Sequence, residues 1–345
     1  MLKQSVRLVV CTLLFTFWGA SVPLAHAATL EKPKITLAVG GKNLFYYLPL
    51  TIAEQRGYFK DEGLEVEIAD FPGGSKALQA MVGGSADVVS GAFEHTINMQ
   101  AKGIAITAVV LQGRYSGIVL GLPKAKAAAY KSAKDLKGLK IGVTAPGSST
   151  NMMVNSLLAK EGLKPDAVII VGVGTTSGAV AAMSKGEIDA ISNLDPAITR
   201  LESAGDIVAV VDTRTAKDMQ TVYGGAYGAG CLYLPIEFTK KYPNTTQAIV
   251  NAMVRALFWI QKATPDEIVT AVPAEYYTGD KAVYKAALEK NLEGYSPDGR
   301  MTMAGARNVY KVLNQFEPSV MAARIDLDKT FDNRFVEQAL KKYKK

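Results

Sequence analysis

The sequence predicts an α/β protein with two similar lobes, each built on a doubly wound, mostly parallel sheet. The main observation is an internal repeat, because residues 77–109 align without a gap with residues 179–211. Predicted strands and helices also alternate, as they do in parallel sheets covered by helices on both faces. No low-complexity linker separates the two halves. We therefore expect two crossover strands to join the lobes, with a cleft where the lobes face each other.

The repeat keeps small and polar residues in place as well as apolar ones. The identical pairs join Ala77, Ala80, Met81, Gly84, Asp87, Ser90 and Gly103 to Ala179, Ala182, Met183, Gly186, Asp189, Ser192 and Gly205. We expect the two aspartates to be structural and to tie the turn before a strand. The copies diverge after the shared serine, where residues 91–95 oppose residues 193–197. These mismatched loops are where we expect ligand specificity.

The N-terminus has the parts of a signal peptide, which assigns residues 1–27 to export. Lys3 and Arg7 precede an apolar run at residues 8–20, and residues 25–27 form an A-x-A cleavage signal. The apolar run is shorter than the ~20 residues that a membrane span needs. We predict cleavage after Ala27 and a location in the periplasm.

The first lobe is predicted from residues 28–116 together with residues 235–345. Pro49 suits the first turn of a helix, and we expect Ser75 to be the N-cap of the next helix. The expected strands are residues 34–39, 64–69, 88–89 and 104–110, and the expected helices are residues 50–55, 76–82 and 94–102. The C-terminal part is mainly helical, with helices expected at residues 251–263, 281–292 and 304–316.

The second lobe is predicted as an insertion of residues 123–228 into the first. Crossovers are expected at residues 117–122 and 229–234, on either side of it. The order of elements repeats that of the first lobe. Its strands are expected at residues 139–143, 167–171, 190–191 and 207–211, and its helices at residues 151–161 and 178–184.

The composition argues against most catalytic and nucleic-acid-binding classes. Once the signal is removed, Cys231 is the single cysteine, so no intramolecular disulfide can form, and we expect a buried thiol. The excess of basic residues, +7 for the whole chain, is too mild and scattered for a nucleic-acid surface. His95 is the one histidine left after His26 departs with the signal, and one histidine cannot build a histidine-rich zinc site. No CxxC, GxxxxGK[ST] or GxSxG motif is present. We expect a binding protein that is not an enzyme, without metal or cofactor.

Ligands of open α/β sheets bind outside the carboxyl ends of the strands, so the loops there supply the candidate site. The sharpest candidate is the loop of Gly147, Ser148, Ser149 and Thr150, where hydroxyls precede a helix whose positive end favours an anion. The alternative is that one of these residues is only an N-cap. Arg114 follows a strand and suits a carboxylate or sulfonate, or else a salt bridge at the hinge.

The mismatched loops and the loop tyrosines supply the other candidates. Phe93, after Ala92, either stacks on a ligand or seals the helix against the sheet. Asn193 and Asp195 bind an amine or hydroxyl, or cap the next helix. Glu94 and His95 begin a helix, where such residues are more often on the surface than in a site. The loop tyrosines Tyr46, Tyr47 and Tyr227 suit a planar or partly apolar ligand.

A family resemblance adds to these inferences. Residues 48–66, LPLTIAEQRGYFKDEGLEV, resemble the signature of periplasmic substrate-binding proteins for nitrate, sulfonate and taurine importers. That group includes related thiamine-precursor binding proteins. Residues 77–87 and 147–150 are similar to its pattern as well. The resemblance implies the two-lobed periplasmic-binding-protein fold, closure on a small molecule, and delivery to the permease and cytoplasmic ATPase of an ABC transporter.

These observations favour an import receptor for a small organic anion such as a sulfonate, a taurine-like compound or an aromatic carboxylate. A receptor for a neutral or cationic pyrimidine thiamine precursor is the alternative. A secreted enzyme using Glu94 and His95 in the same cleft and a ligand-presenting sensor domain are further alternatives. No nucleic acid is expected as a partner, and the protein is expected to be a monomer.

Overall fold

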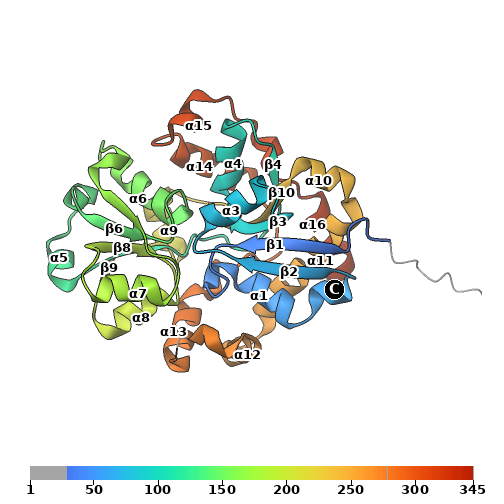
Figure 1. The fold of residues 1–345 in the computed structure, drawn as a ribbon, viewed down its shortest axis with the longest axis horizontal. Coiled ribbons are helices and arrows are strands. Elements are labelled where there is room, and N and C mark those ends of the chain that lie inside the picture. Colours follow the sequence, from blue (N-terminus) through green and yellow to red (C-terminus); the bar gives the residue numbers. More distant parts are fainter. Residues whose placement is uncertain (1–28, 278, 345) are drawn as a thin grey trace, which may run out of the picture.

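The computed structural model describes residues 29–277 and 279–344. It places two α/β lobes side by side, with the second lobe on the left of Figure 1 and the C-terminal helices around the first. The predicted signal peptide and its cleavage after Ala27 lie outside the described residues, so both stay predictions. No helix among the described residues is long and apolar enough to cross a membrane.

The first lobe contains a five-stranded sheet in which one strand runs against the others. Its order is β2-β1-β3-β10-β4, and β10 pairs antiparallel with both neighbours while β1 pairs parallel with β2 and β3. The mostly parallel sheet predicted from the sequence is confirmed. The strands are β1 Lys34–Val39, β2 Glu65–Asp70, β3 Val88–Ala92, β4 Ile106–Leu111 and β10 Gly230–Pro235.

The second sheet has the same plan as the first. Its order is β7-β6-β8-β5-β9, and β5 pairs antiparallel with both β8 and β9, in the position that β10 has in the first sheet. The strands are β5 Val119–Leu122, β6 Lys140–Val143, β7 Ile169–Gly172, β8 Ala190–Asn193 and β9 Val208–Asp212.

The two expected crossovers are mostly strands inside the sheets. Residues 119–122 of the first form β5, and residues 230–234 of the second belong to β10. The chain passes between the sheets just before each strand, in residues 112–118 and 224–229. The reason is that these apolar segments are buried on both faces, which suits a central strand better than an exposed link. The proposed lobe limits stay a prediction.

Helices cover both faces of each sheet. Around the second sheet, α6 and α9 lie on one face and α7 and α8 on the other (Figure 1). The second lobe has α5 Lys124–Ala129, α6 Ser149–Lys160, α7 Ser177–Ser184, α8 Ala197–Ala204 and α9 Ala216–Tyr223. The helical elements in the first part of the first lobe are the 3-10 turn η1 Phe45–Tyr47 and the helices α1 Leu48–Gln55, α2 Tyr58–Asp61, α3 Gly74–Val82 and α4 Glu94–Ala101.

The C-terminal part is mainly helical, as expected. Its longest helix begins earlier than the apolar pattern predicts, at Pro243, because proline is favourable in the first turn of a helix. The helices are α10 Ile236–Lys241, α11 Pro243–Lys262, α12 Pro265–Ala271, α13 Lys281–Asn291, α14 Met303–Leu313, α15 Pro318–Ala322 and α16 Arg334–Tyr343.

The repeat is visible in the structure down to single hydrogen bonds. Helix α3, β3, α4 and β4 of the first copy correspond in order to α7, β8, α8 and β9 of the second. Asp87 accepts a hydrogen bond from the Thr36 N–H at 3.1 Å, and Asp189 accepts one from the Lys140 N–H at 2.9 Å. Both aspartates therefore bond the parallel strand next to their own, β1 or β6, so their role is structural as expected, although the bond is to a strand and not within the turn.

Candidate functional site

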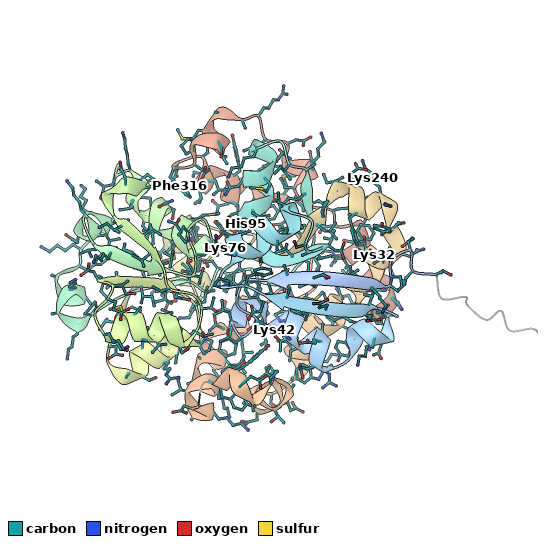
Figure 2. All side chains as sticks on the ribbon, in the orientation of Figure 1. Lys32, Lys42, Lys76, His95, Lys240 and Phe316 are labelled. Carbon is teal, nitrogen blue, oxygen red and sulfur yellow. The ribbon has the colours of Figure 1, made fainter. Side chains whose placement is uncertain are left out.

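The first turn of α4 places two titratable side chains at the boundary between the lobes. Glu94 is 2% exposed and His95 is 1% exposed. The expectation that they lie on the surface was therefore wrong. They are buried because β3 ends at the lobe boundary, where Tyr227 binds Glu94 and Gly74 lies close to His95. Figure 2 labels His95 beside α4, near the second lobe.

Tyrosine side chains surround the Glu94 carboxyl group. The Tyr227 hydroxyl donates a hydrogen bond to Glu94 Oε1 at 3.1 Å, and the Tyr223 ring stacks on the Tyr227 ring at 4.3 Å between centroids. Glu94 Oε2 and the Tyr46 hydroxyl are buried without a hydrogen-bond partner among the described residues. We call Glu94, Tyr46, Tyr223 and Tyr227 the Glu94 cluster. Of its two unpartnered oxygen atoms, Glu94 Oε2 can accept a hydrogen bond from a bound molecule, and the Tyr46 hydroxyl can donate one to it.

Burial sets the protonation of this cluster. Desolvation raises the pKa of Glu94 to about 7, and the hydrogen bond from Tyr227 only partly opposes that rise. Burial also raises the pKa of Tyr46 and Tyr227 well above the ordinary value, and the nearby Glu94 carboxylate adds to the rise. The tyrosines are therefore neutral hydrogen-bonding groups, while Glu94 changes charge near neutral pH.

A cavity of about 530 Å³ adjoins the Glu94 cluster at Tyr227. Its walls come from the two segments that cross between the sheets, from α9 and from residues 296–302. The lining residues include Arg114, Tyr115, Met219 and Arg300. Arg114 donates a hydrogen bond to the Glu293 carbonyl oxygen at 2.7 Å and lies over the Tyr115 ring. Within residues 29–277 and 279–344 Arg114 forms no ion pair, so the salt bridge considered for it is absent.

The loop of Gly147, Ser148, Ser149 and Thr150 joins the two lobes. Ser148 Oγ accepts a hydrogen bond from the Ser75 N–H at 3.0 Å, and Ser75 Oγ donates one to the Pro146 carbonyl oxygen at 2.9 Å. Thr150 Oγ1 accepts one from the Thr144 N–H. These hydroxyl groups thus hold the loop and the lobe contact, and Ser149 begins α6. Ligand binding by this loop stays a prediction.

Asp195 binds the first turn of α8 and also connects the lobes. Pro196 is the N-cap residue of α8, and Asp195 Oδ1 accepts a hydrogen bond from the Thr199 N–H at 2.8 Å. Its Oδ2 pairs with Arg214 at 3.2 Å and accepts a hydrogen bond from the Asn291 amide, in α13, at 2.7 Å. Asn193 instead binds within the second lobe, where its amide donates to the Gly174 carbonyl oxygen at 3.0 Å.

Arg214 is a buried residue of this boundary that the sequence analysis missed. It is 5% exposed and forms ion pairs with Asp195, Asp212 and Glu202. Its position two residues after β9, at the carboxyl end of a strand, was a signal that could have identified it, as Arg114 was identified after β4. The four charges hold the end of β9 against α8.

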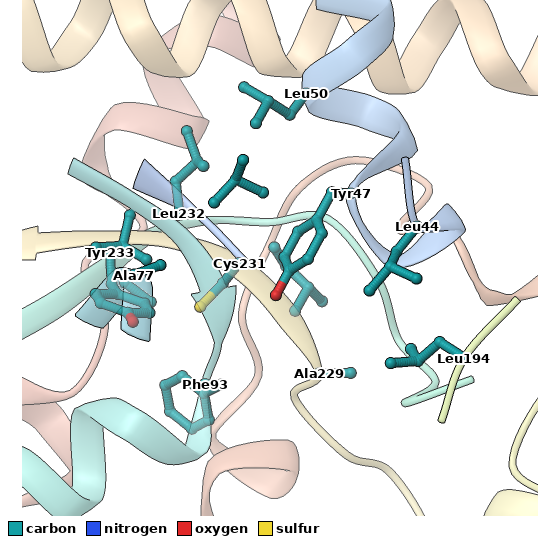
Figure 3. Close-up of a cluster of buried hydrophobic side chains, with 14 of the residues drawn as sticks. Leu44, Tyr47, Leu50, Ala77, Phe93, Leu194, Ala229, Cys231, Leu232 and Tyr233 are labelled. Carbon is teal, nitrogen blue, oxygen red and sulfur yellow. The ribbon is translucent and has the colours of Figure 1, made fainter. Parts of the chain in front are cut away.

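The apolar candidates belong to the core. Phe93 is fully buried, and a Cβ atom added at Gly228 would lie 3.1 Å from its ring. Figure 3 shows Phe93 near Tyr47, Cys231 and Ala229 in one buried cluster. Phe93 therefore packs in the core beside residues 228–229, and its stacking on a ligand stays a prediction. Ala92 and Tyr47 are also buried, and Cys231 is a buried free thiol as expected.

The structure thus brings some candidates together and separates others. Tyr46, Glu94 and Tyr227 meet in the Glu94 cluster, and Arg114 lines the cavity beside it. The loop 147–150 meets Ser75, and Asp195 meets α13. Among the described residues, no group of three or more histidine, cysteine, aspartate or glutamate side chains is placed to hold a metal ion.

Solved proteins share this arrangement of two sheets. One is a protein of Bordetella bronchiseptica RB50, with 57% identity and a TM-score of 0.89 over 92% of this chain and all of that one. Another is the alkanesulfonate-binding protein SsuA of Xanthomonas axonopodis pv. citri, bound to MOPS. It has 17% identity and a TM-score of 0.69, covering 90% of this chain and 99% of that one. The fold is that of the periplasmic solute-binding proteins of ABC importers.

The family follows from the sequence. A family model described as NMT1/THI5 like matches residues 44–268, and the chain belongs to that family. It is also similar to the 4-amino-5-hydroxymethyl-2-methylpyrimidine phosphate synthase of Schizosaccharomyces pombe. The identity is 26% over 229 residues, which cover 64% of this chain and 63% of the synthase. The chain is therefore similar both to a protein named as a binding protein and to one named as an enzyme.

Proposed function

We propose that the protein is the receptor of an ABC importer in the periplasm, and that it binds a small molecule beside the Glu94 cluster. The observation that carries this proposal is a buried carboxyl group between the lobes whose Oε2 atom has no partner in the part of the chain described. Buried polar atoms are almost always hydrogen-bonded, so a ligand that supplies the missing partner stabilises this arrangement. The partners are then a membrane permease and its cytoplasmic ATPase, and the receptor acts as a monomer.

The ligand that fits this cluster best has N–H donors and an aromatic body. A carboxylate accepts hydrogen bonds, and the rings of Tyr46, Tyr223 and Tyr227 offer apolar surface next to it. A neutral or cationic aminopyrimidine combines both features. The pyrimidine in the name of the Schizosaccharomyces pombe relative supports the same class. We therefore place a pyrimidine ahead of the anion that the sequence alone favours.

A small organic anion is the second candidate, and Arg114 favours it. Arg114 and Arg300 both line the cavity that reaches Tyr227. The likeness to an alkanesulfonate-binding protein supports this class too. An anion beside Glu94, however, meets a carboxyl group with a pKa of about 7, and two like charges in a buried site repel each other.

The Glu94→Gln variant separates the two ligand classes by the sign of its effect. Calorimetric titration of 4-amino-5-hydroxymethyl-2-methylpyrimidine, taurine, an alkanesulfonate and benzoate identifies the class that binds the unaltered protein. Loss of a hydrogen bond to a charged group costs about 1.5–3 kcal/mol, so we expect the variant to bind the pyrimidine roughly ten to a hundred times more weakly. An anion is expected to bind the variant equally well or more tightly. Binding of a sulfonate or carboxylate, with no binding of any pyrimidine, contradicts the pyrimidine proposal.

Two other functions use the same fold. An enzyme working through Glu94 and His95 is expected to lose turnover in Glu94→Gln and His95→Ala, whereas a receptor shows no turnover of its bound ligand in any form. A sensor domain is distinguished by its genetic neighbours, since genes for a permease and an ATPase beside this one favour transport.

A further inference from the structure

A second cavity lies along α4, where His95, Asn98 and Met99 line it. Its volume is about 570 Å³, and it shares no lining residue with the cavity at Tyr227. Helices α3 and α4 of the first lobe form one wall, and the loop before α6 and α6 itself, in the second lobe, form the other. Because both lobes line it, the cavity exists in this shape only while the lobes are together.

Two buried polar side chains line this cavity, and each has one polar atom without a hydrogen-bond partner among the described residues. His95 is 1% exposed and Asn98 is 5% exposed, and His95 Nε2 and Asn98 Oδ1 make no hydrogen bond within the described part of the chain. The Asn98 amide nitrogen already points to the Met152 sulfur at 3.8 Å. Buried polar atoms without partners are rare in folded proteins, so a pair on one cavity wall indicates a ligand.

The hydrogen-bonding character of the pair follows from their neighbours. Burial lowers the pKa of His95 to about 4, so the ring is neutral at neutral pH. Its Nδ1 lies 2.9 Å from the Tyr233 hydroxyl. In the tautomer with the hydrogen on Nε2, the Tyr233 hydroxyl donates to Nδ1. The wall then offers an N–H donor from His95 and a carbonyl acceptor from Asn98.

The rest of the lining favours an uncharged molecule with an apolar body. Leu78, Met99 and Met152 are buried apolar side chains of this cavity. Lys102 and Glu317 carry opposite charges at its edge, so neither sign of ligand is favoured. A primary carboxamide on an aromatic or aliphatic ring matches both features. Its carbonyl oxygen accepts from His95 Nε2–H, and its N–H donates to Asn98 Oδ1.

We propose that the cavity between α3, α4 and α6 is a second ligand site, which takes a small neutral carboxamide and binds it with His95 and Asn98 across the closed lobes. The site is independent of the Glu94 cluster and of the ligand that the cluster takes. A molecule bound there contacts both lobes and therefore favours the closed arrangement.

Methyl NMR of the purified protein with nicotinamide as the probe tests this site directly. With ¹³C-methyl methionine labelling, we expect nicotinamide to shift the Met99 and Met152 signals, because both residues line the cavity. Met219 lines the cavity at Tyr227 instead and is the internal control, with no shift expected. Shifts at Met219 alone, or no shift of any methionine at 10 mM nicotinamide (on the order of the weakest specific affinities), overturn the proposal.

A pair of variants separates this site from the proposed receptor site. Asn98→Leu removes the acceptor at similar volume, and we expect it to weaken nicotinamide binding at least tenfold while the main ligand binds as before. Tyr46→Phe is expected to weaken the main ligand and leave nicotinamide unaffected. Equal nicotinamide affinity in the unaltered protein and Asn98→Leu contradicts the second site, whatever the main ligand does. If Asn98→Leu lowers the melting temperature, Asn98→Asp keeps the acceptor oxygen and is expected to retain the methionine shifts.

Discussion

Glu94 and His95 are neighbours in the chain whose pKa values shift in opposite directions for one reason. Both are buried at the start of α4, and burial disfavours the charged form of each. For Glu94 that raises the pKa to about 7, and for His95 it lowers the pKa to about 4. At neutral pH, α4 therefore begins with one carboxyl group near its midpoint and one uncharged imidazole. A local sequence pattern cannot reveal this, because the covering residues come from distant segments.

The first prediction concerns the pH dependence of stability. Glu94 has a raised pKa in the folded protein, so its stabilising contribution is full below pH 4.5 and falls as the pH rises to 7. His95 has a lowered pKa, so its contribution is full above pH 6.5 and falls as the pH drops to 4. Each pKa shift corresponds to about 3 kcal/mol of unfolding free energy at most. In the unaltered protein the two contributions change in opposite directions between pH 4.5 and 6.5 and largely cancel.

Urea unfolding of Glu94→Gln, His95→Gln and the unaltered protein at several pH values separates the two contributions to the unfolding free energy. Relative to the unaltered protein, Glu94→Gln is expected to gain up to about 3 kcal/mol of unfolding free energy between pH 4.5 and 7. His95→Gln is expected to be relatively more stable at pH 4 than at pH 6.5, by a similar amount. Because other titrating groups are common to all three proteins, they drop out of these differences. Parallel pH profiles for the three proteins contradict buried positions for both side chains.

At the scale of elements, the repeat could be predicted from sequence because identical residues perform identical tasks. Asp87 and Asp189 are the best example, since each bonds the neighbouring parallel strand, β1 or β6. The placement of β5 and β10 inside the sheets could not be predicted. A short apolar segment such as residues 119–122 is compatible with a crossover and with a central strand, and only pairing with β8 and β9 decides between them.

The contact between the loop before α3 and the loop before α6 depends on a missing side chain. Gly73 has an extended backbone that any residue can adopt, but a Cβ atom there would lie 2.7 Å from Ala145 Cβ in the other lobe. We expect Gly73→Ala to push the lobes apart and to weaken ligand binding by about 1–3 kcal/mol, the usual cost of overpacking. Calorimetry measures the affinity, and small-angle scattering measures the separation of the lobes.

The compensating variant supplies the control for this prediction. Ala145→Gly removes the atom that the new methyl group meets, so Gly73→Ala combined with Ala145→Gly is expected to recover most of the affinity. If the single and double variants bind equally weakly, then the loss comes from the first lobe itself and not from the lobe contact.

At the scale of the whole molecule, α13 connects the lobes away from both cavities. Its Tyr284 ring packs on Phe45 of the first lobe at 4.6 Å between centroids. At its C-terminal end, Asn291 donates to Asp195 and Lys290 pairs with Glu202 of the second lobe, at 2.7 and 2.8 Å. Figure 1 shows α13 below the second lobe, next to α8. The helix therefore acts as a bridge that holds the lobes in their present relation.

Removing this bridge is expected to favour the open arrangement. Asn291→Ala deletes a hydrogen bond to a charged group, worth about 1.5–3 kcal/mol, so we expect ligand affinity to fall with little change in the unfolding midpoint of either lobe. Lys285→Ala is the matched control, because Lys285 lies on the same helix but pairs with Asp266 of α12. Equal affinities of the two variants contradict a role for α13 in closure.

The positions of β5 and β10 in the two sheets also affect the order in which the sheets can be completed during synthesis. All five strands of the second sheet lie within residues 119–212, so that sheet is complete soon after β9 leaves the ribosome. In the first sheet, β3 and β4 have no strand between them until β10, residues 230–235, has been made. The inserted lobe can therefore finish folding while the lobe that was begun first still waits for its fifth strand.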